Sequence, residues 1–200
     1  MNEPSAMLLM SGPLAVGKTA VRDELVSKYG FAYLRSSEYL RAEVERAGLR
    51  GERAVLQELG DRLDEETDYR WLIDSVALPA MKRAPDSSRW VVDAVRKKRQ
   101  VEHFRDAFAG GVFHVHFTAD ESILVERYQA RQRSQGVVAD PTPYDSAIDH
   151  DNERSARSLD DVADMLVDLG KCSASGAAEA IVSALSQRAL ARPIGTKETG

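Results

Sequence analysis

Residues Gly12 to Thr19 read GPLAVGKT and match G-x-x-x-x-G-K-[ST], a pattern that holds nucleotide phosphates. Its two glycines let the backbone turn sharply, so that amide N–H groups point at phosphate oxygens. Its lysine reaches the β- and γ-phosphates, and its last hydroxyl holds Mg²⁺. We expect a bound nucleotide with Mg²⁺, with Lys18 catalytic and Thr19 a metal ligand; the cofactor-binding set is Gly12, Pro13, Leu14, Ala15, Val16, Gly17, Lys18, Thr19 and Ala20.

The flanks of this loop predict the elements that such a loop requires. The apolar run Met7 to Met10 is typical of a buried strand, and Lys18 to Tyr29 has the apolar spacing of a helix that stops at Gly30. The positive end of that helix would add a favourable potential for phosphate oxygens. A plain glycine turn with a surface lysine is the alternative, but it would not need these neighbours.

A carboxylate follows another apolar run. Trp90 to Val92 reads as a strand, and Asp93 comes directly after it. Ligands of parallel α/β sheets bind beyond the carboxyl ends of the strands. We expect Asp93 to act through water on Mg²⁺ or to orient the acceptor oxygen, which makes it a catalytic and metal-site candidate. The alternative is that Asp93 only caps the next helix.

Two arginines lie four residues apart on the predicted helix Asp120 to Arg133. Like charges at this spacing repel each other, so Arg127 and Arg131 gain nothing structurally from their placement. Arginines aimed at a transferring phosphoryl group stabilise the charge that spreads over its oxygens. We therefore expect both to be catalytic and to contact the donor phosphates.

Several classes of nucleotide-binding protein are excluded by missing motifs. A GTPase would carry Asn-Lys-x-Asp, but the only asparagines are Asn2 and Asn152, and neither begins that motif. A transporter ATPase would carry a Leu-Ser-Gly-Gly-type signature, which is also missing. A large mechanical ATPase would need a longer chain. The pattern therefore favours a small kinase that uses ATP and Mg²⁺.

Composition and charge limit the classes of molecule that this protein is expected to bind. The net charge is -5, with acidic and basic residues interleaved, so no overall attraction for nucleic acid or an anionic membrane is expected. The single cysteine, Cys172, excludes an internal disulfide and suits a reducing compartment. The first residues do not resemble a signal peptide, and no apolar run reaches transmembrane length. We expect a cytoplasmic protein whose partner is a small-molecule nucleotide.

The order of elements predicts an α/β fold, the three-layer P-loop NTPase type, with a five-stranded parallel sheet covered by helices on both faces. Residues 1–189 should form a single domain, with acceptor-binding helices at about 36–83, a lid at about 132–158 and a flexible tail at 190–200. The Pro-, Gly- and Asp-rich segment 134–150 is predicted to be a long mobile loop inside the lid. The expected strands are Met7–Met10, Phe31–Leu34, Trp90–Val92, Val112–Phe117 and Met165–Leu169.

Two histidines alternate with apolar residues on one of these strands. His114 and His116 should face the same side of the sheet, because side chains of a strand alternate between its faces. No third ligand or partner for metal or acid–base chemistry is evident, so we interpret them as strand residues satisfied by hydrogen bonds.

The sequence resembles the P-loop nucleoside and deoxynucleoside monophosphate kinases, including adenylate-kinase-like and dephospho-coenzyme-A-kinase-like proteins. The resemblance covers roughly residues 6–187. It is carried by the phosphate-binding loop, by SSEYLR at 36–41, by VVDAVRKKRQ at 91–100 and by LVERYQAR at 124–131. The family pattern Asp-Gly-x-x-Arg is kept as Asp93-Ala94-Val95-Arg96, with alanine in place of the glycine.

The resemblance implies a set of acceptor-side residues. In such kinases a hydroxyl and an arginine of the segment matching SSEYLR hold the acceptor phosphate, positions taken here by Ser37 and Arg41, although a serine there also suits a helix cap. Arg96 should pair with the same phosphate through its planar fork and act catalytically. The arginine pair on the helix 120–133 matches the one that leads into the family's lid. The implied substrate-binding set is Ser37, Arg41, Arg53, Gln57, Arg96 and Gln100.

The function implied is phosphoryl transfer from Mg-ATP to a nucleoside or deoxynucleoside monophosphate, without a covalent enzyme intermediate. One alternative stays within the kinases and takes dephospho-coenzyme A or another small alcohol as acceptor. The other is a nucleotide-binding regulatory module that hydrolyses ATP slowly or not at all.

Overall fold

Five strands form one parallel sheet in the computed structural model, which describes residues 4–93, 95–135 and 142–191. The spatial order is β2 (Ala32–Tyr33), β3 (Arg89–Val92), β1 (Ala6–Ser11), β4 (Val112–Thr118) and β5 (Met165–Asp168). Every neighbouring pair runs parallel, with Leu8 of β1 opposite both Val91 and Phe113. The predicted fold class and the five predicted strands are confirmed, each strand within a residue or two of its expected limits.

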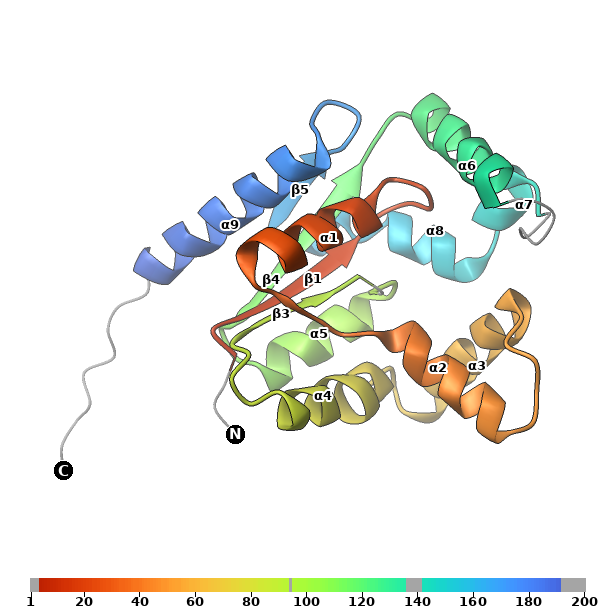
Figure 1. Cartoon of the computed structure of the whole chain (residues 1–200), viewed down its shortest axis with the longest axis horizontal. Coiled ribbons are helices and arrows are strands. Elements are labelled where there is room, and N and C mark those ends of the chain that lie inside the picture. The colour runs from red at the N-terminus through yellow and green to blue at the C-terminus, as the bar shows by residue number, and fades with distance from the viewer. Residues whose placement is uncertain (1–3, 94, 136–141, 192–200) are drawn as a thin grey trace.

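Both faces of the sheet are buried, as the alternation along β1 shows. Leu8 and Met10 pack on the face covered by α1 (Lys18–Tyr29) and α9 (Ala174–Ala191), where Ile181 is fully buried. Met7 and Leu9 pack on the opposite face, covered by α5 (Lys98–Ala107) and by helices of the segment 71–83. Figure 1 shows the sheet between these two helical layers. The layers fix the carboxyl ends of β1 and β3 at one edge of the molecule.

The predicted acceptor-binding helices are α2 (Ser36–Arg46), α3 (Arg53–Glu66), the π-helix η1 (Leu72–Ala77) and α4 (Leu78–Arg83). The helices predicted at about 36–83 are separated after α3 by a turn at 67–71, where Asp68 and Tyr69 have φ values of 48° and 63°. The turn brings the indole Nε1 of Trp71 back to donate a hydrogen bond to Asp64 at 2.7 Å. Because both members of this pair are buried, their hydrogen bond stabilises the turn between α3 and η1.

The segment that follows β4 contains α6 (Glu121–Gln135), α7 (Tyr144–Ile148), α8 (Asp151–Arg157) and the short η3 (Asp160–Val162). A long loop was predicted for 134–150. In its described part this is wrong, because Tyr144 packs edge-on against Tyr128, its hydroxyl donates to Glu121, and the contact holds a short helix. Residues 136–141, and the tail from 192 onward, lie outside the described residues.

Figure 1 shows how these parts surround one edge of the sheet: α6, α7 and α8 lie on one side of it, and α2 with α3 on the other. Over residues 4–93, 95–135 and 142–191, no helix is long and apolar enough to cross a membrane.

Candidate active site

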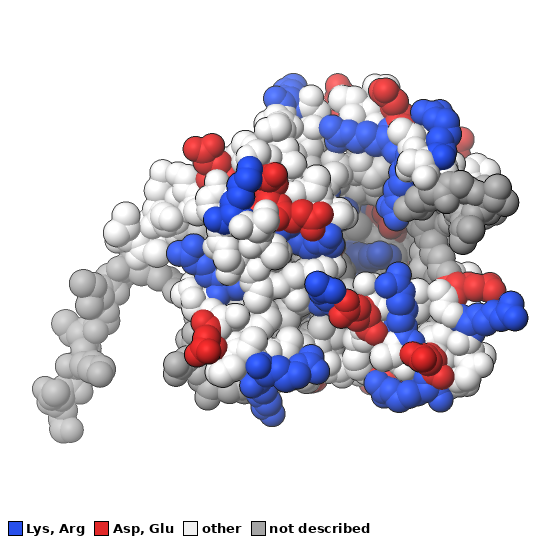
Figure 2. Space-filling view, viewed as in Figure 1, with Lys and Arg blue, Asp and Glu red and all other residues white. Residues whose placement is uncertain are grey.

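Two adjoining cavities lie between α6–α8 and α2–α3, beyond the carboxyl ends of β1 and β3. The first has a volume of about 760 Å³ and is lined by the loop 12–20 together with residues of α6 and α8. The second has about 370 Å³ and is lined by α2, α3 and the start of α5. Figure 2 shows this hollow, with Lys and Arg side chains gathered along it. Six residues line both cavities: Leu14, Ser36, Ser37, Arg96, Arg131 and Glu153.

The loop after β1 has the backbone that its glycines predict. Gly12 and Gly17 have φ values of 133° and 113°, and Ala15 also lies in the left-handed region at 63°. A Cβ atom at Gly12 would collide with the carbonyl oxygen of Phe117 at the end of β4. The close approach of loop and strand therefore requires glycine at this position.

Lys18 is turned inward over the loop. Its Nζ donates hydrogen bonds to the carbonyl oxygens of Gly12 at 2.6 Å and Pro13 at 3.0 Å. Burial lowers the pKa of Lys18 from 10.5 to about 8, Arg96 lowers it further, and the carboxylates of Glu153 and Asp93 oppose the change. A desolvated cation that lines the first cavity is suited to bind an anionic phosphate.

Thr19 and Ala20 are exposed and line the first cavity next to Lys18. The Thr19 hydroxyl fits the predicted magnesium role, since it borders the space that phosphates would fill.

Asp93 lies at the carboxyl end of β3 and lines the first cavity. Its Oδ2 accepts a hydrogen bond from Arg22 at 2.8 Å and its Oδ1 accepts one from the Tyr33 hydroxyl at 2.7 Å. The guanidinium of Arg22 also lies 4.4 Å from the centre of the Tyr33 ring. Lys97, not Asp93, is the residue before α5, so Asp93 does not cap that helix. It fits a role on Mg²⁺ through water, since each bonded oxygen keeps a second lone pair.

Sequence reasoning missed Arg22 and Tyr33, although signals for both were present. Arg22 follows Lys18 by one helical turn and therefore shares its face of α1. Tyr33 ends β2, which is the neighbour of β3, and the carboxyl ends of parallel strands meet at one edge.

The two arginines of α6 are placed differently. Arg127 donates from Nη1 to the carbonyl of Val16 at 2.7 Å and from Nη2 to that of Leu169 at 2.9 Å. The expectation that Arg127 has no structural use is therefore wrong, because it ties the phosphate-binding loop to the end of β5. It also lines the first cavity, and its contact with donor phosphates stays a prediction. Arg131 is exposed and lines both cavities, where it can reach donor and acceptor.

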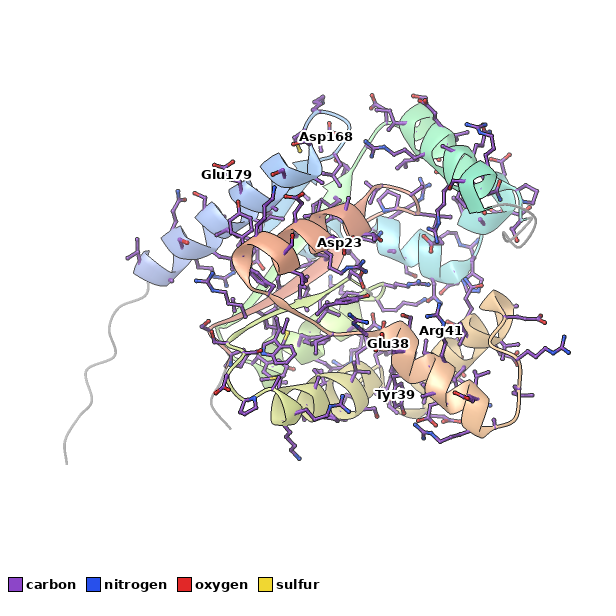
Figure 3. All side chains as sticks on the ribbon, in the orientation of Figure 1. Asp23, Glu38, Tyr39, Arg41, Asp168 and Glu179 are labelled. Atoms are coloured by element: carbon purple, nitrogen blue, oxygen red, sulfur yellow. The ribbon has the colours of Figure 1, made fainter. Side chains whose placement is uncertain are left out.

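The predicted acceptor residues lie together in the second cavity, which is lined by Ser37, Arg41, Gln57, Arg96 and Gln100. Figure 3 shows Arg41 on α2, on the side of the molecule that faces α8. α2 begins at Ser36 after Arg35 and has no side-chain cap, so Ser37 is not needed for capping. Arg53 is the first residue of α3, and its side chain lies outside what the structure describes.

Gln100 is buried and its amide is largely engaged within the protein. Its Oε1 accepts from the backbone N–H of Arg96 at 2.9 Å and of Lys97 at 3.2 Å, and its Nε2 donates to Asp64 at 3.0 Å. Asp64 also holds Trp71, and burial raises the pKa of its carboxyl group. Gln100 borders the cavity, but these bonds fit it better for positioning Arg96 than for reading an acceptor base.

His114 and His116 face the same side of β4, as predicted, and both contact Ser11. The Ser11 hydroxyl lies 2.7 Å from Nε2 of His114 and 2.9 Å from Nδ1 of His116. Nδ1 of His114 lies 3.2 Å from the carbonyl of Val162, and burial lowers the pKa of this histidine to about 4. The neutral group of three links β1 to β4 directly before the phosphate-binding loop.

Glu153 on α8 is a further site residue that was missed from the sequence. It is only 5% exposed, lines both cavities and lies 3.9 Å from Nη1 of Arg96. No spacing in the chain singles out its carboxylate, because α8 reaches the cavities only through its packing.

Comparison with known protein families agrees with this geometry. A family model described as an AAA domain, AAA_17, matches residues 11–142, which is more than half of the chain. The chain belongs to this family. It is an ATP-dependent P-loop kinase, and the resemblance drawn from its motifs is confirmed. Its fold is shared with solved structures of a gluconokinase and a shikimate kinase.

Individual relatives of this P-loop kinase are distant. Adenylate kinase isoenzyme 1 of Gallus gallus is 26% identical over 136 residues, covering 67% of this chain and 68% of the relative. Adenylate kinase 1 of Drosophila melanogaster is 29% identical, covering 75% of this chain and 60% of the relative. The crystal structure of a gluconokinase from Sinorhizobium meliloti shares the fold with a TM-score of 0.55 at 15% identity, covering 94% and 96% of the two chains.

Proposed function

We propose that this P-loop kinase transfers the γ-phosphoryl group of ATP to a small acceptor that carries an anionic group of its own. The observation that carries the proposal is the pair of adjoining cavities: the phosphate-binding loop lines the first, and Arg41 and Arg96 line the second. Arginines pair with phosphate or carboxylate through two parallel hydrogen bonds, so they suit an acceptor with such a group.

On the donor side, the loop N–H groups and Lys18 would hold the β- and γ-phosphates, while Arg127 keeps the loop against β5. Thr19 and, through water, Asp93 would hold Mg²⁺, which supplies positive charge to the phosphates. Arg131 lines both cavities and would approach the γ-phosphoryl group during transfer. In-line attack by the acceptor oxygen then needs no covalent enzyme intermediate.

A nucleoside monophosphate is the first candidate acceptor. Its phosphate would lie on Ser37, Arg41 and Arg96, and its base would extend toward Gln57. The distant likeness to two adenylate kinases supports this class.

An alcohol that bears an anionic group, such as dephospho-coenzyme A, is the second candidate. Glu153 favours it, because a buried carboxylate between the two cavities suits a hydroxyl nucleophile better than a charged phosphate. The fold shared with a gluconokinase agrees with this class.

The test is phosphoryl transfer from labelled ATP to a panel of canonical and modified nucleoside monophosphates and of anionic alcohols. Arg96→Ala should lower acceptor turnover by about 100-fold or more while ATP still binds. Arg99→Ala is the matched control, since Arg99 is an exposed partner of Asp68 that lines neither cavity, and it should keep full activity. Hydrolysis without transfer to any acceptor would instead indicate a regulatory module, and full activity of Lys18→Ala would overturn the donor site.

A further inference from the structure

Four carboxylates line the two cavities, and three of them already accept hydrogen bonds. Asp93 accepts from Arg22 and Tyr33, and Asp23 accepts from Arg22. Asp64 accepts from Trp71 and Gln100. Among the residues that the structure describes, the carboxylate of Glu153 accepts no hydrogen bond.

Glu153 is nevertheless buried. Its side chain is 7% exposed, and its nearest charged partner, Arg96 Nη1, is 3.9 Å away, beyond hydrogen-bond distance. It lies close enough to Lys18 to raise the pKa of that lysine. Its oxygens are not among the fully enclosed side-chain atoms that lack a partner, so they border the cavities, where a ligand can supply the donor.

The neighbours of Glu153 on α8 fix its place. Asn152 donates to Asp61 of α3, and Lys97 contacts both Asp151 and, at 3.1 Å, the hydroxyl of Ser155. α8 is thereby attached to the acceptor helices and to the residue after Arg96. Because α8 is attached in this way, the backbone of Glu153 is fixed at the boundary of the two cavities.

That boundary lies between Lys18 and Arg96, which is where an acceptor oxygen must stand to attack the γ-phosphoryl group. A phosphate nucleophile is already ionised, so it needs no base and would be repelled by a carboxylate there. A hydroxyl nucleophile must lose a proton, and a nearby carboxylate both accepts its hydrogen bond and takes that proton.

We propose that Glu153 accepts the proton of a hydroxyl group on the acceptor, and that the acceptor is therefore an alcohol anchored by a separate anionic group on Arg41 and Arg96. The acceptor oxygen forms the new bond to the γ-phosphorus, the bond from that phosphorus to the bridging oxygen of ADP breaks, and the proton passes to Glu153 and then to water. This inference rests on the proposed kinase function and narrows its acceptor.

The experiment compares Glu153→Gln with Glu179→Gln, since Glu179 is exposed on α9, on the opposite flank of the molecule (Figure 3). The probes are AMP, CMP, GMP, UMP and dTMP on one side, and dephospho-coenzyme A, gluconate and shikimate on the other. Transfer to water is followed as slow ATP hydrolysis, because water is also a hydroxyl acceptor. Melting temperature and ATP affinity are measured for every variant.

We expect the wild-type protein to transfer the γ-phosphoryl group to at least one of the anionic alcohols. Glu153→Gln should lower that kcat by about 100- to 10,000-fold, the usual contribution of a general base. ATP affinity and melting temperature should stay near the wild-type values, and Glu153→Asp should restore part of the rate. The defect should also shrink for an alcohol whose hydroxyl is made more acidic by neighbouring fluorine, which a purely structural role would not produce.

The opposite results are equally clear. Efficient transfer to a nucleoside monophosphate that Glu153→Gln leaves unchanged or accelerates would overturn the inference while the proposed kinase function stands. An unchanged kcat of Glu153→Gln with an alcohol or with water would also overturn the inference and leave the kinase function standing. A wild-type protein that transfers the γ-phosphoryl group to none of the acceptors, whether or not it hydrolyses ATP, would overturn the proposed function itself, and the inference with it.

Discussion

The pKa of Lys18 makes ATP binding depend on pH in a direction that can be stated in advance. Burial lowers this pKa to about 8 in the empty protein. Bound phosphates would favour the charged form and raise the pKa again, so ATP binding should take up protons above pH 7. Because the empty site must first be protonated, ATP affinity should fall as the pH rises through 8.

The magnitude follows from the same value. One pH unit above its pKa, about nine in ten empty proteins carry a neutral lysine, so affinity should fall about tenfold between pH 7 and pH 9. Proton uptake should be about 0.1 per ATP at pH 7 and about 0.9 at pH 9. Above pH 7 the ATP phosphates are essentially ionised and add little to this dependence.

Isothermal calorimetry in two buffers of different ionisation enthalpy measures both the affinity and the proton uptake. Lys18→Met is the control, because it removes the titrating group and should give weak binding that is flat with pH. Equal affinity at pH 7 and pH 9 in the wild type, or the same proton uptake in Lys18→Met, would refute the reasoning.

The lysine also bears on stability. In the unfolded chain its pKa is near 10.5, so the empty folded protein bears the cost of a desolvated cation below pH 8, and this cost disappears between pH 8 and 10.5. Lys18→Met should therefore raise the free energy of unfolding at pH 7 by about 1 to 2 kcal/mol while abolishing tight ATP binding. A destabilised Lys18→Met variant at pH 7 would contradict this sign.

Three further predictions concern the frame of the site. Gly12→Ala places a Cβ against β4 at a φ of 133° and should lower the free energy of unfolding in urea by more than about 3 kcal/mol. Gly51→Ala is the control, because its Cβ would lie in open space and should change this free energy little. Equal effects of the two variants would contradict the contact. Arg22→Met leaves the partly buried Asp93 without its cation and should cost about 2 to 4 kcal/mol by thermal unfolding, so an unchanged melting temperature would exclude a stabilising pair. His114 has a pKa of about 4 in the folded protein and 6.5 in the unfolded chain, so the free energy of unfolding should fall by about 3 kcal/mol as the pH falls from 6.5 toward 4. His114→Gln should remove this pH dependence, measured by urea unfolding. An unchanged pH dependence would show that another group causes it.

The parts of the fold that the sequence predicted are those decided locally. The loop 12–19 needs glycine where φ is positive, and the strands are short apolar runs because both faces of the sheet are buried. The two histidines were placed on one side of β4 by simple alternation. Each of these features depends on neighbours in the chain, so a single sequence is enough to find it.

The parts that were missed depend on residues far apart in the chain. The turn at 67–71 exists because Trp71 reaches Asp64 and, through it, Gln100 of α5. α7 forms within a segment rich in loop residues because Tyr144 finds Tyr128 and Glu121. No periodicity or turn residue records such contacts, so tertiary packing overrides the local signal at both places.

The acceptor side of the site contains both residues that were predicted from the sequence and a residue that was missed. The family pattern directed attention to Arg41 and Arg96, and the structure brings both to the second cavity. The same pattern, together with the end of β3, directed attention to Asp93 as a carboxylate for Mg²⁺ or for orienting the acceptor oxygen, and its two oxygens accept hydrogen bonds from Arg22 and Tyr33. The carboxylate that accepts no hydrogen bond in the described structure comes instead from α8.

Lys97 links the acceptor-side arginine to the helix that carries Glu153. Its side chain bonds Asp151 and Ser155 on either side of Glu153, while its backbone N–H and that of Arg96 both donate to Gln100. One residue thus fixes the distance between the acceptor-side arginine and the helix that carries Glu153. A phosphate clamp alone would need only the bonds to Gln100, which position Arg96. The bonds to Asp151 and Ser155 hold α8, which carries the carboxylate that we propose as the proton acceptor.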